Sequence, residues 1–189
     1  EEGKTTVVTQ LALAAAEAGR RVLLIDGDLR RPRLHDIFQV SNAIGFSDLL
    51  QSLSDSETVP EGAIHALQSS GLHVMTAGTK TANISRLLYS AFLPILLRRL
   101  RSEFDLILID SPPMLQLADA RVLGRAVETV VLVLRAGKTT RETAHAARQS
   151  LAEDGTPLLG TVLNRWDSKR YPSYGYTGPY PKQSASASW

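Results

Sequence analysis

Residues 21–26 read RVLLID, a short and almost continuous apolar run that ends in a carboxylate. A run of this kind predicts a β-strand buried on both faces, as the strands of parallel sheets are. Residues 106–110 read LILID and repeat the pattern, again with a terminal aspartate. We therefore expect two strands of one parallel sheet, with Asp26 and Asp110 at the edge where ligands bind.

Around these two runs, strand-like and helix-like apolar patterns alternate along the chain. Their alternation predicts an α/β fold, a parallel sheet flanked by helices on both faces. Pro94 predicts a break or kink in the longest helical pattern. The expected strands cover residues 21–26, 72–77, 106–110, 129–135 and 158–164, and the expected helices cover residues 5–18, 34–38, 45–53, 61–68, 84–103, 118–125 and 139–154.

The overall composition is that of one globular domain and excludes several kinds of site. The chain has 189 residues, of which 43% are hydrophobic and 21% charged. Cysteine is absent, which excludes disulfides, thiolate metal sites and a cysteine nucleophile. The four histidines show no metal-ligand spacing. The longest apolar stretches, residues 87–97 and 127–134, are much shorter than the roughly 20 residues that cross a bilayer.

The composition changes after Asn164. Residues 165–189 are rich in Tyr, Ser, Pro and Gly and lack periodicity, so we expect a domain over residues 1–164 followed by a flexible tail. The net charge is +2, whereas residues 164–189 alone carry +3. A nearly neutral domain with a basic tail gives no indication of a nucleic-acid partner.

Residues 3–6 read GKTT and match the second half of the phosphate-binding loop G-x-x-x-x-G-K-[ST]. In such a loop, backbone N–H groups surround the phosphates, the lysine reaches the β- and γ-phosphates and the threonine binds Mg²⁺. The alternative is an ordinary loop–helix junction. Residues 137–140 repeat these letters, but they follow the expected strand 129–135 too closely to encircle a phosphate. That second copy predicts a strand–helix turn.

Three aspartates follow the apolar runs. Asp26 and Asp28 are separated by one residue, and their carboxylates repel each other unless a cation or an arginine neutralises them. Arg30 and Arg31 are close enough in sequence to form such ion pairs, so this alternative stays open. Asp110 matches the Walker B acid that holds Mg²⁺, although a turn or helix-capping aspartate would read the same way.

Residues 23–32, LLIDGDLRRP, resemble the Walker A′ motif of the bacterial tyrosine kinases. These are cytoplasmic P-loop kinase domains that work with polysaccharide co-polymerases in capsule and exopolysaccharide export. Residues 108–113, LIDSPP, resemble their Walker B motif, and the similarity continues in order over residues 1–180. The resemblance implies a Rossmann-like, three-layer P-loop NTPase fold. It also implies that the strand before the phosphate loop and half of that loop are missing, so that this chain would be inactive alone.

The resemblance further implies an ATP-dependent protein-tyrosine autokinase that uses ATP and Mg²⁺. Lys4 would neutralise the β- and γ-phosphates, and Asp26 would accept the proton of the attacking tyrosine. The nucleotide would contact Gly3, Lys4, Thr5, Thr6 and, through adenine, Asn164. The metal would be held by Thr5, Asp28 and Asp110, which with Lys4 and Asp26 complete the catalytic set.

Four of the five tyrosines lie in the tail, at Tyr171, Tyr174, Tyr176 and Tyr180. Family members carry a similar cluster that is phosphorylated in trans, whereas the plainer interpretation is a low-complexity segment. The resemblance also implies a membrane polysaccharide co-polymerase or activator as partner, fused or separate, and a homo-oligomer. It places the chain in the cytoplasm at the inner face of the membrane, without direct insertion of this segment.

Two other functions remain open. The first is an ATPase switch of the partitioning and division-site-selection type, which uses nucleotide-driven dimerisation instead of phosphoryl transfer. Such proteins usually lack a tyrosine cluster and often end in an amphipathic membrane helix, which the prolines and glycines of residues 165–189 do not permit. The second is a binding module without catalytic activity.

Overall fold

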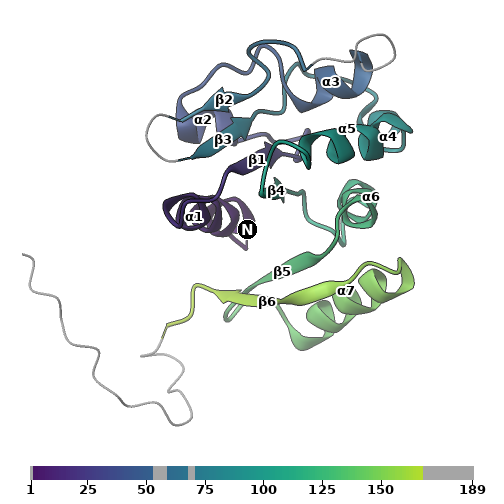
Figure 1. Cartoon of the computed structure of the whole chain (residues 1–189). Helices are drawn as coiled ribbons and strands as arrows, with labels where there is room; N and C mark the ends of the chain where they lie inside the picture. Colours follow the sequence, from purple (N-terminus) through teal and green to yellow (C-terminus); the bar gives the residue numbers. More distant parts are fainter. Residues whose placement is uncertain (1, 53–58, 68–70, 168–189) are drawn as a thin grey trace, which may run out of the picture.

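The computed structural model describes residues 2–52, 59–67 and 71–167 (Figure 1). Strands and helices alternate, which confirms the α/β class. The elements are α1 (Lys4–Glu17), β1 (Val22–Asp26), α2 (Leu34–Phe38), α3 (Phe46–Ser52), β2 (His65–Ala66), β3 (Leu72–Met75), α4 (Ile84–Leu88), α5 (Phe92–Leu100), β4 (Leu106–Asp110), α6 (Ala118–Ala126), β5 (Val130–Arg135), α7 (Arg141–Glu153) and β6 (Leu158–Asn164).

β1 lies inside a four-stranded sheet with the order β2-β3-β1-β4. It pairs in parallel with β3 on one side and with β4 on the other, and all five of its residues are buried. The parallel arrangement of these three strands was predicted and is confirmed. The helix expected over residues 61–68 is wrong for its described part, residues 61–67, because this segment contains the two-residue strand β2, antiparallel to β3. Pairing along β3 satisfies backbone groups that an edge strand leaves open.

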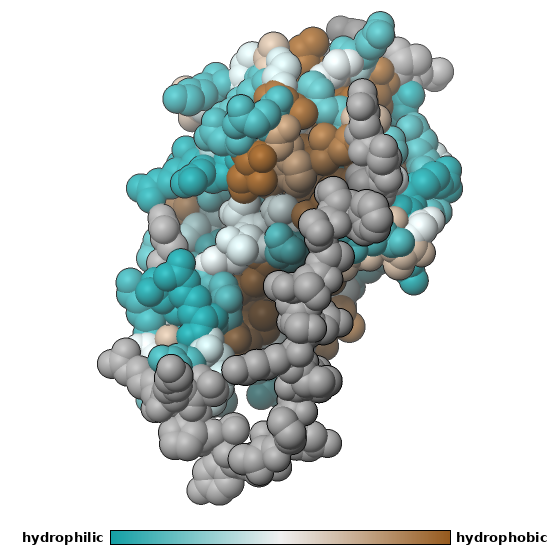
Figure 2. Space-filling model, turned by 90° about the vertical axis from the view of Figure 1, so that its left-hand side faces the viewer, coloured by the Kyte–Doolittle hydropathy of each residue, from teal (hydrophilic) through white to brown (hydrophobic). Residues whose placement is uncertain are grey.

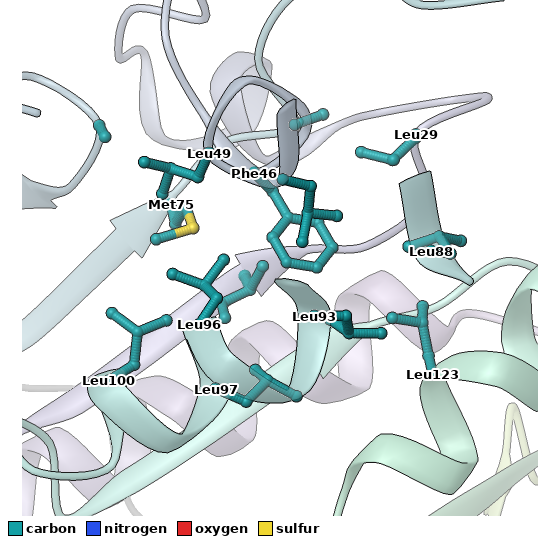
Figure 3. Close-up of a cluster of buried hydrophobic side chains, with 14 of the residues drawn as sticks. Leu29, Phe46, Leu49, Met75, Leu88, Leu93, Leu96, Leu97, Leu100 and Leu123 are labelled. Atoms are coloured by element: carbon teal, nitrogen blue, oxygen red, sulfur yellow. The ribbon is translucent and has the colours of Figure 1, made fainter. Parts of the chain in front are cut away.

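Apolar side chains alternate between the two faces of β1, so that each face has its own core. Val22 and Leu24 pack with α1 and α2 on one face. Leu23 and Ile25 pack on the other face with α3, α4, α5 and α6, around Phe46 (Figure 3). Helices therefore cover both faces of this sheet, which confirms the three-layer arrangement.

The helical pattern over residues 84–103 is divided in two. α4 ends at Leu88 and α5 begins at Phe92. Pro94 lies in the first turn of α5, where its missing N–H removes no helical hydrogen bond. α5 then buries four leucines at helical spacing: Leu93, Leu96, Leu97 and Leu100.

β5 and β6 form a separate two-stranded parallel sheet, joined through α7. A cleft of about 820 Å³ lies between β4 and β5 and is lined by both strands, α1 and α6. Figure 1 shows the two sheets on either side of it. Within the described residues, β4 pairs only with β1 and β5 only with β6, so each presents an open edge to the cleft. The further strand expected beside residues 106–110 remains a prediction.

The surface combines hydrophilic and apolar areas. On the face shown in Figure 2, apolar surface lies in the upper half and again in the lower half, at the height of the β5–β6 sheet in Figure 1. The exposed apolar side chains of this sheet include Val131, Leu159 and Leu163. Across residues 2–52, 59–67 and 71–167, no helix combines the length and the apolar character needed to span a membrane.

Candidate functional site

Asp26 and Asp110 end neighbouring strands in register. β1 and β4 pair from Val22 with Leu106 to Asp26 with Asp110, so both carboxylates leave the same edge of the sheet. Gly27 makes the approach possible: its N–H donates to the Asp110 carbonyl at 2.8 Å, and a Cβ here would lie 2.7 Å from that oxygen. The two strand ends are thus joined directly beside the carboxylates.

The Asp26 carboxylate is fully buried but only half satisfied. Its Oδ2 accepts hydrogen bonds from the N–H groups of Arg33 and Leu34, each at 2.9 Å. Its Oδ1 has no partner among the described residues. Burial raises the pKa of Asp26; the backbone N–H groups of Leu34, Arg33 and Asp28 oppose the rise, and the charge of Asp28 adds to it. A buried oxygen without a partner is unfavourable, so Oδ1 is available to accept a hydrogen bond from a ligand.

Asp28 lies in the loop after β1 and is more exposed than Asp26. The N–H of Arg31 donates to its Oδ1 at 3.1 Å. The charge of Asp28 contributes to the raised pKa of both Asp26 and Asp110. The ion pair with Arg30 that the sequence left open is not formed, because this arginine binds another carboxylate.

Gly3 and the start of α1 form a helix N-terminus suited to an anion. Gly3 has φ +88°, a conformation that favours glycine, and α1 begins at the next residue, Lys4. The first N–H groups of a helix have no partner within it, and the helix dipole is positive there. The Lys4 ammonium lies 2.9 Å from the Glu2 carboxylate, so it already holds an anionic group.

Thr5 connects this loop to the strand edge. Its Oγ1 donates to Oδ2 of Asp110 at 2.5 Å, although 105 positions separate the two residues. Burial raises the pKa of Asp110 to about 6; the hydrogen bond from Thr5 opposes the rise and the charge of Asp26 adds to it. A hydroxyl and a carboxylate are the hard oxygen ligands that Mg²⁺ prefers. Thr6, the remaining residue of the motif, is exposed.

Asn164, at the end of β6, contacts the same loop. Its Nδ2 donates to the Glu2 carbonyl and its Oδ1 accepts from the N–H of Arg165, each at 2.8 Å. A Cβ on Gly3 would lie 2.3 Å from Nδ2, so this glycine also makes room for the amide. Asn164 therefore links β6 to the start of α1, while its expected contact with adenine remains a prediction.

The residues present fit Mg²⁺ bound together with a nucleotide. Over the part of the chain that the structure describes, no group of three or more His, Cys, Asp or Glu side chains is arranged as a preformed metal site. Magnesium with a nucleotide needs less, because it binds one or two carboxylates and takes its other ligands from phosphates and water. Asp110 and Thr5, which are joined by a hydrogen bond, meet that requirement together with Asp28 in the loop after β1.

The second GKTT segment forms a turn between β5 and α7. Gly137 has φ +69°. The Oγ1 of Thr139 accepts from the N–H of Arg135 at 2.9 Å, and the Oγ1 of Thr140 accepts from the N–H of Thr143 at 3.2 Å. These bonds close the turn and cap α7, which confirms the strand–helix interpretation.

The partner of Arg30 is Asp119, a residue that none of the sequence motifs indicates. Asp119 stands in the first turn of α6, and its side chain is only 3% exposed. In the sequence it looks like an ordinary acid at a helix start. The apolar residues around it, including Ala120 and Val122, were the available signal that this acid is buried.

The predicted phosphoacceptors Tyr171, Tyr174, Tyr176 and Tyr180 lie outside the described residues, as does most of the expected tail 165–189. Their attachment point is defined, because β6 ends at Asn164 beside Glu2. The four tyrosines follow Asn164 by 7 to 16 positions.

Known sequences similar to this chain include named tyrosine kinases. Residues 2–142 match the family described as AAA domain. Tyrosine-protein kinase YwqD of Bacillus subtilis (strain 168) is 36% identical over 177 residues, which cover 94% of this chain and 73% of that protein. Tyrosine-protein kinase etk of Escherichia coli (strain K12) is 35% identical over 176 residues; these cover 93% of this chain but only 24% of etk.

Solved structures give the same result. The chimerical protein CapA2B2 aligns with a TM-score of 0.81 and 31% identity, over 88% of this chain and 72% of that one. The kinase domain of Escherichia coli tyrosine kinase ETK aligns with a TM-score of 0.79 and 34% identity, over 95% and 68%. The cell division ATPase MinD of Pyrococcus furiosus aligns with a TM-score of 0.71 and 30% identity, over 87% and 68%. These matches confirm the predicted fold class.

Proposed function

Because this chain belongs to the family of bacterial tyrosine-protein kinases, we propose that it transfers the γ-phosphoryl group of ATP to tyrosine side chains. The observation that carries the proposal is the meeting of Thr5, Asp26 and Asp110 at one sheet edge, with one buried oxygen of Asp26 unpartnered. In phosphoryl transfer the protein mainly positions the reacting groups and neutralises charge.

We assign the nucleotide to the start of α1. The first N–H groups of the helix, with Gly3 and Thr6, would surround the phosphates. Lys4 would exchange the Glu2 carboxylate for the β- and γ-phosphates, because both are anions that a single ammonium can hold. Asn164 borders this loop, which supports its assignment to the adenine end.

The three carboxylates would then divide the remaining work. Asp28 and Asp110, with Thr5, would hold Mg²⁺, which when bound neutralises and orients the phosphates. Asp26 would accept the proton of the attacking phenol through Oδ1. Its burial supports this role, because a raised pKa favours the protonated form that proton transfer produces.

We propose the tail tyrosines Tyr171, Tyr174, Tyr176 and Tyr180 as phosphoacceptors, modified by a neighbouring subunit of a homo-oligomer. Their attachment beside the phosphate loop supports this assignment. Each phosphate would add a charge of about −1.5 to −2 to a segment that now carries +3, so two or more would cancel or reverse it.

We also propose a membrane polysaccharide co-polymerase or activator as partner, fused or separate, with the chain on the cytoplasmic side of the membrane. The family resemblance supports this partner. It is also consistent with the length of etk, of which the chain matches about a quarter.

A second candidate function is a nucleotide-driven dimerisation switch. Its support is the alignment with MinD at 30% identity, since that protein is named a cell division ATPase. The two functions differ in one product: only the kinase leaves phosphate on tyrosine.

The deciding experiment mixes two forms of the full-length protein with ATP and Mg²⁺. One carries Lys4→Met and an intact tail; the other has an intact Lys4 and phenylalanine at all four tail positions. Phosphotyrosine on the Lys4→Met chain, located by mass spectrometry, is the expected result and means transfer between subunits. A matched control is Lys138→Met in the second GKTT segment, which should leave phosphorylation unchanged. Nucleotide-dependent dimers without phosphotyrosine would favour the switch. Phosphate found only on Tyr89, the one tyrosine outside the tail, would reject the tail assignment.

A further inference from the structure

An ion pair beside the three carboxylates joins two loops of the site. Nε of Arg30 lies 2.6 Å from Oδ2 of Asp119, although 89 positions separate the two residues. Arg30 follows Asp28 by two positions in the loop after β1. Asp119 stands in the first turn of α6, at the end of the loop that leaves Asp110. The hydroxyl of Ser85, in the first turn of α4, approaches Oδ1 of Asp119 at 3.4 Å.

This pair is poorly explained as a contact that only stabilises the fold. Asp119 is 3% exposed, whereas Arg30 is 41% exposed. Taking a carboxylate out of water is unfavourable, and one arginine with a helix N-terminus offsets only part of that penalty. Apolar residues of similar volume often stabilise a protein at least as well. The pair therefore calls for a role in positioning.

The loop between β1 and α2 is fixed at both ends. The N–H of Gly27 donates to the last carbonyl of β4 at 2.8 Å. The N–H of Arg33 donates to the carboxylate of Asp26 at 2.9 Å. Asp28 lies between these anchors, and the hydrogen bond to its own carboxylate comes from Arg31 of the same loop. Gly27 therefore ties the backbone next to Asp28 to β4, but neither anchor holds the side chain of Asp28.

Arg30 ties the middle of this loop to α6. That helix begins at Ala118, after the loop that leaves β4 at Asp110. One ion pair therefore connects the loop that carries Asp28 with the loop that follows Asp110. Its loss would release the loop beyond Gly27, so that the side chain of Asp28 would be less constrained relative to Asp110 while the two strands stay paired.

We propose that Arg30 and Asp119 are positioning residues, which hold Asp28 at the distance from Asp110 that Mg²⁺ bound with a nucleotide requires. The inference rests on the proposed function and adds two residues to its site. Because Arg30 forms its ion pair with Asp119, it does not neutralise the carboxylates at the strand ends. Their negative charge can therefore attract the cation.

The test compares Arg30→Gln, Asp119→Asn and the double variant in the full-length protein. Binding of a fluorescent ATP analogue is titrated with and without Mg²⁺. Each single variant should raise the Mg²⁺ concentration for half-maximal binding by about tenfold or more, since changes to residues that orient metal ligands typically cost 10–100-fold. Affinity without Mg²⁺ should stay within about twofold, because it depends on Lys4 and the start of α1. The double variant should need no more Mg²⁺ for half-maximal binding than the more strongly affected single variant, because the two residues act as one unit.

Two further variants and one stability measurement complete the design. Arg31→Gln removes the neighbouring exposed charge and should leave the Mg²⁺ dependence unchanged, while Arg30→Lys should recover part of the loss. Urea unfolding is measured for every variant. An unchanged Mg²⁺ midpoint in both single variants overturns the proposal. Equal losses with and without Mg²⁺, together with a lower unfolding midpoint, also overturn it, because they indicate a purely structural contact.

The outcome is separable from that of the proposed function. A wild-type protein that binds the analogue with Mg²⁺ but forms no phosphotyrosine rejects the kinase, while the Mg²⁺ titrations still decide the role of the ion pair. A wild-type protein without Mg²⁺-dependent binding rejects both.

Discussion

The four-stranded sheet and the two-stranded sheet differ in how completely their strands are buried. Every residue of β1 is buried, whereas β6 has exposed residues at four of its seven positions. Leu24 in β1 is fully buried and Leu163 in β6 is 49% exposed. β1 has a paired strand on each side and helices on both faces, whereas among the described residues β5 pairs only with β6. Similar apolar runs thus end in different environments.

This contrast explains where the rigidity of the site originates. Asp26 and Asp110 end the paired strands β1 and β4, and both residues are buried; their separation is set by a continuous ladder of pairs. The two-stranded region reaches the site through Asn164, which bonds to the Glu2 carbonyl. We infer that the strand pairing of the first region positions the carboxylates and that the second region contributes the Asn164 contact at the loop.

The largest expected effect contrasts the same substitution in the two sheets. Leu24→Ala should lower the free energy of unfolding by about 3–4 kcal/mol, because it leaves a cavity in a closed core. Leu163→Ala should cost less than about 1 kcal/mol, since half of that side chain is already in water. Urea unfolding followed by circular dichroism measures both. Equal losses would mean that the β5–β6 sheet is covered in solution.

A second prediction uses two glycines. Gly27→Ala places a Cβ 2.7 Å from both the Asp110 carbonyl and the side chain of Ile109, so it should cost about 1–3 kcal/mol by overpacking. It should also weaken Mg²⁺-dependent nucleotide binding, because Asp110 must move. Gly160→Ala, in β6, meets nothing within 4 Å and should be neutral or slightly stabilising. A Gly27→Ala protein with unchanged unfolding and binding would contradict the close approach of the strand ends.

Much of the fold could be predicted because apolar runs, turns and breaks are local signals. Residues 34–38, 106–110 and 158–164 form the elements predicted, with the same bounds. The strand β2 could not be predicted, because its two residues are a strand only by pairing with the edge of β3. The order of the strands was equally hidden, because it depends on packing between distant segments and leaves no local pattern.

The site shows the same division between local and distant information. A carboxylate at the end of a parallel strand lies at the carboxyl edge of the sheet, so the shared edge of Asp26 and Asp110 could be predicted. The partner of Arg30 could not, since reasoning from nearby residues offered Asp26 and Asp28, while the structure selects Asp119, 89 positions away. Nor could the contact between Asn164 and the Glu2 carbonyl be predicted, because it joins opposite ends of the domain.

The smallest expected effect concerns the ion pairs that link α6 of the first region to α7 of the second. The carboxylate of Asp154 binds Arg121 at 2.5 and 2.7 Å and also binds Arg125. Arg121, and to a smaller extent Arg125, holds the pKa of Asp154 well below its usual range. The folded protein therefore keeps this carboxylate ionised at pH values where an unfolded chain takes up a proton.

The sign of the pH effect follows from this lowered pKa. Above the ordinary carboxyl pKa of about 3.9, both states are ionised and the link contributes fully; as the pH falls below it, only the unfolded state gains the proton and the contribution is lost. The Asp154→Asn variant should therefore have a lower free energy of unfolding than the wild type at pH 7. On acidification it should lose less of that free energy, because its unfolding near pH 3 takes up to about one proton fewer. Urea unfolding from pH 7 to pH 2.5 measures this slope. Asp105→Asn, in an exposed pair with Arg21 beside the first sheet, should change the slope less. If both variants follow the wild-type slope, the link between the two regions contributes nothing to stability.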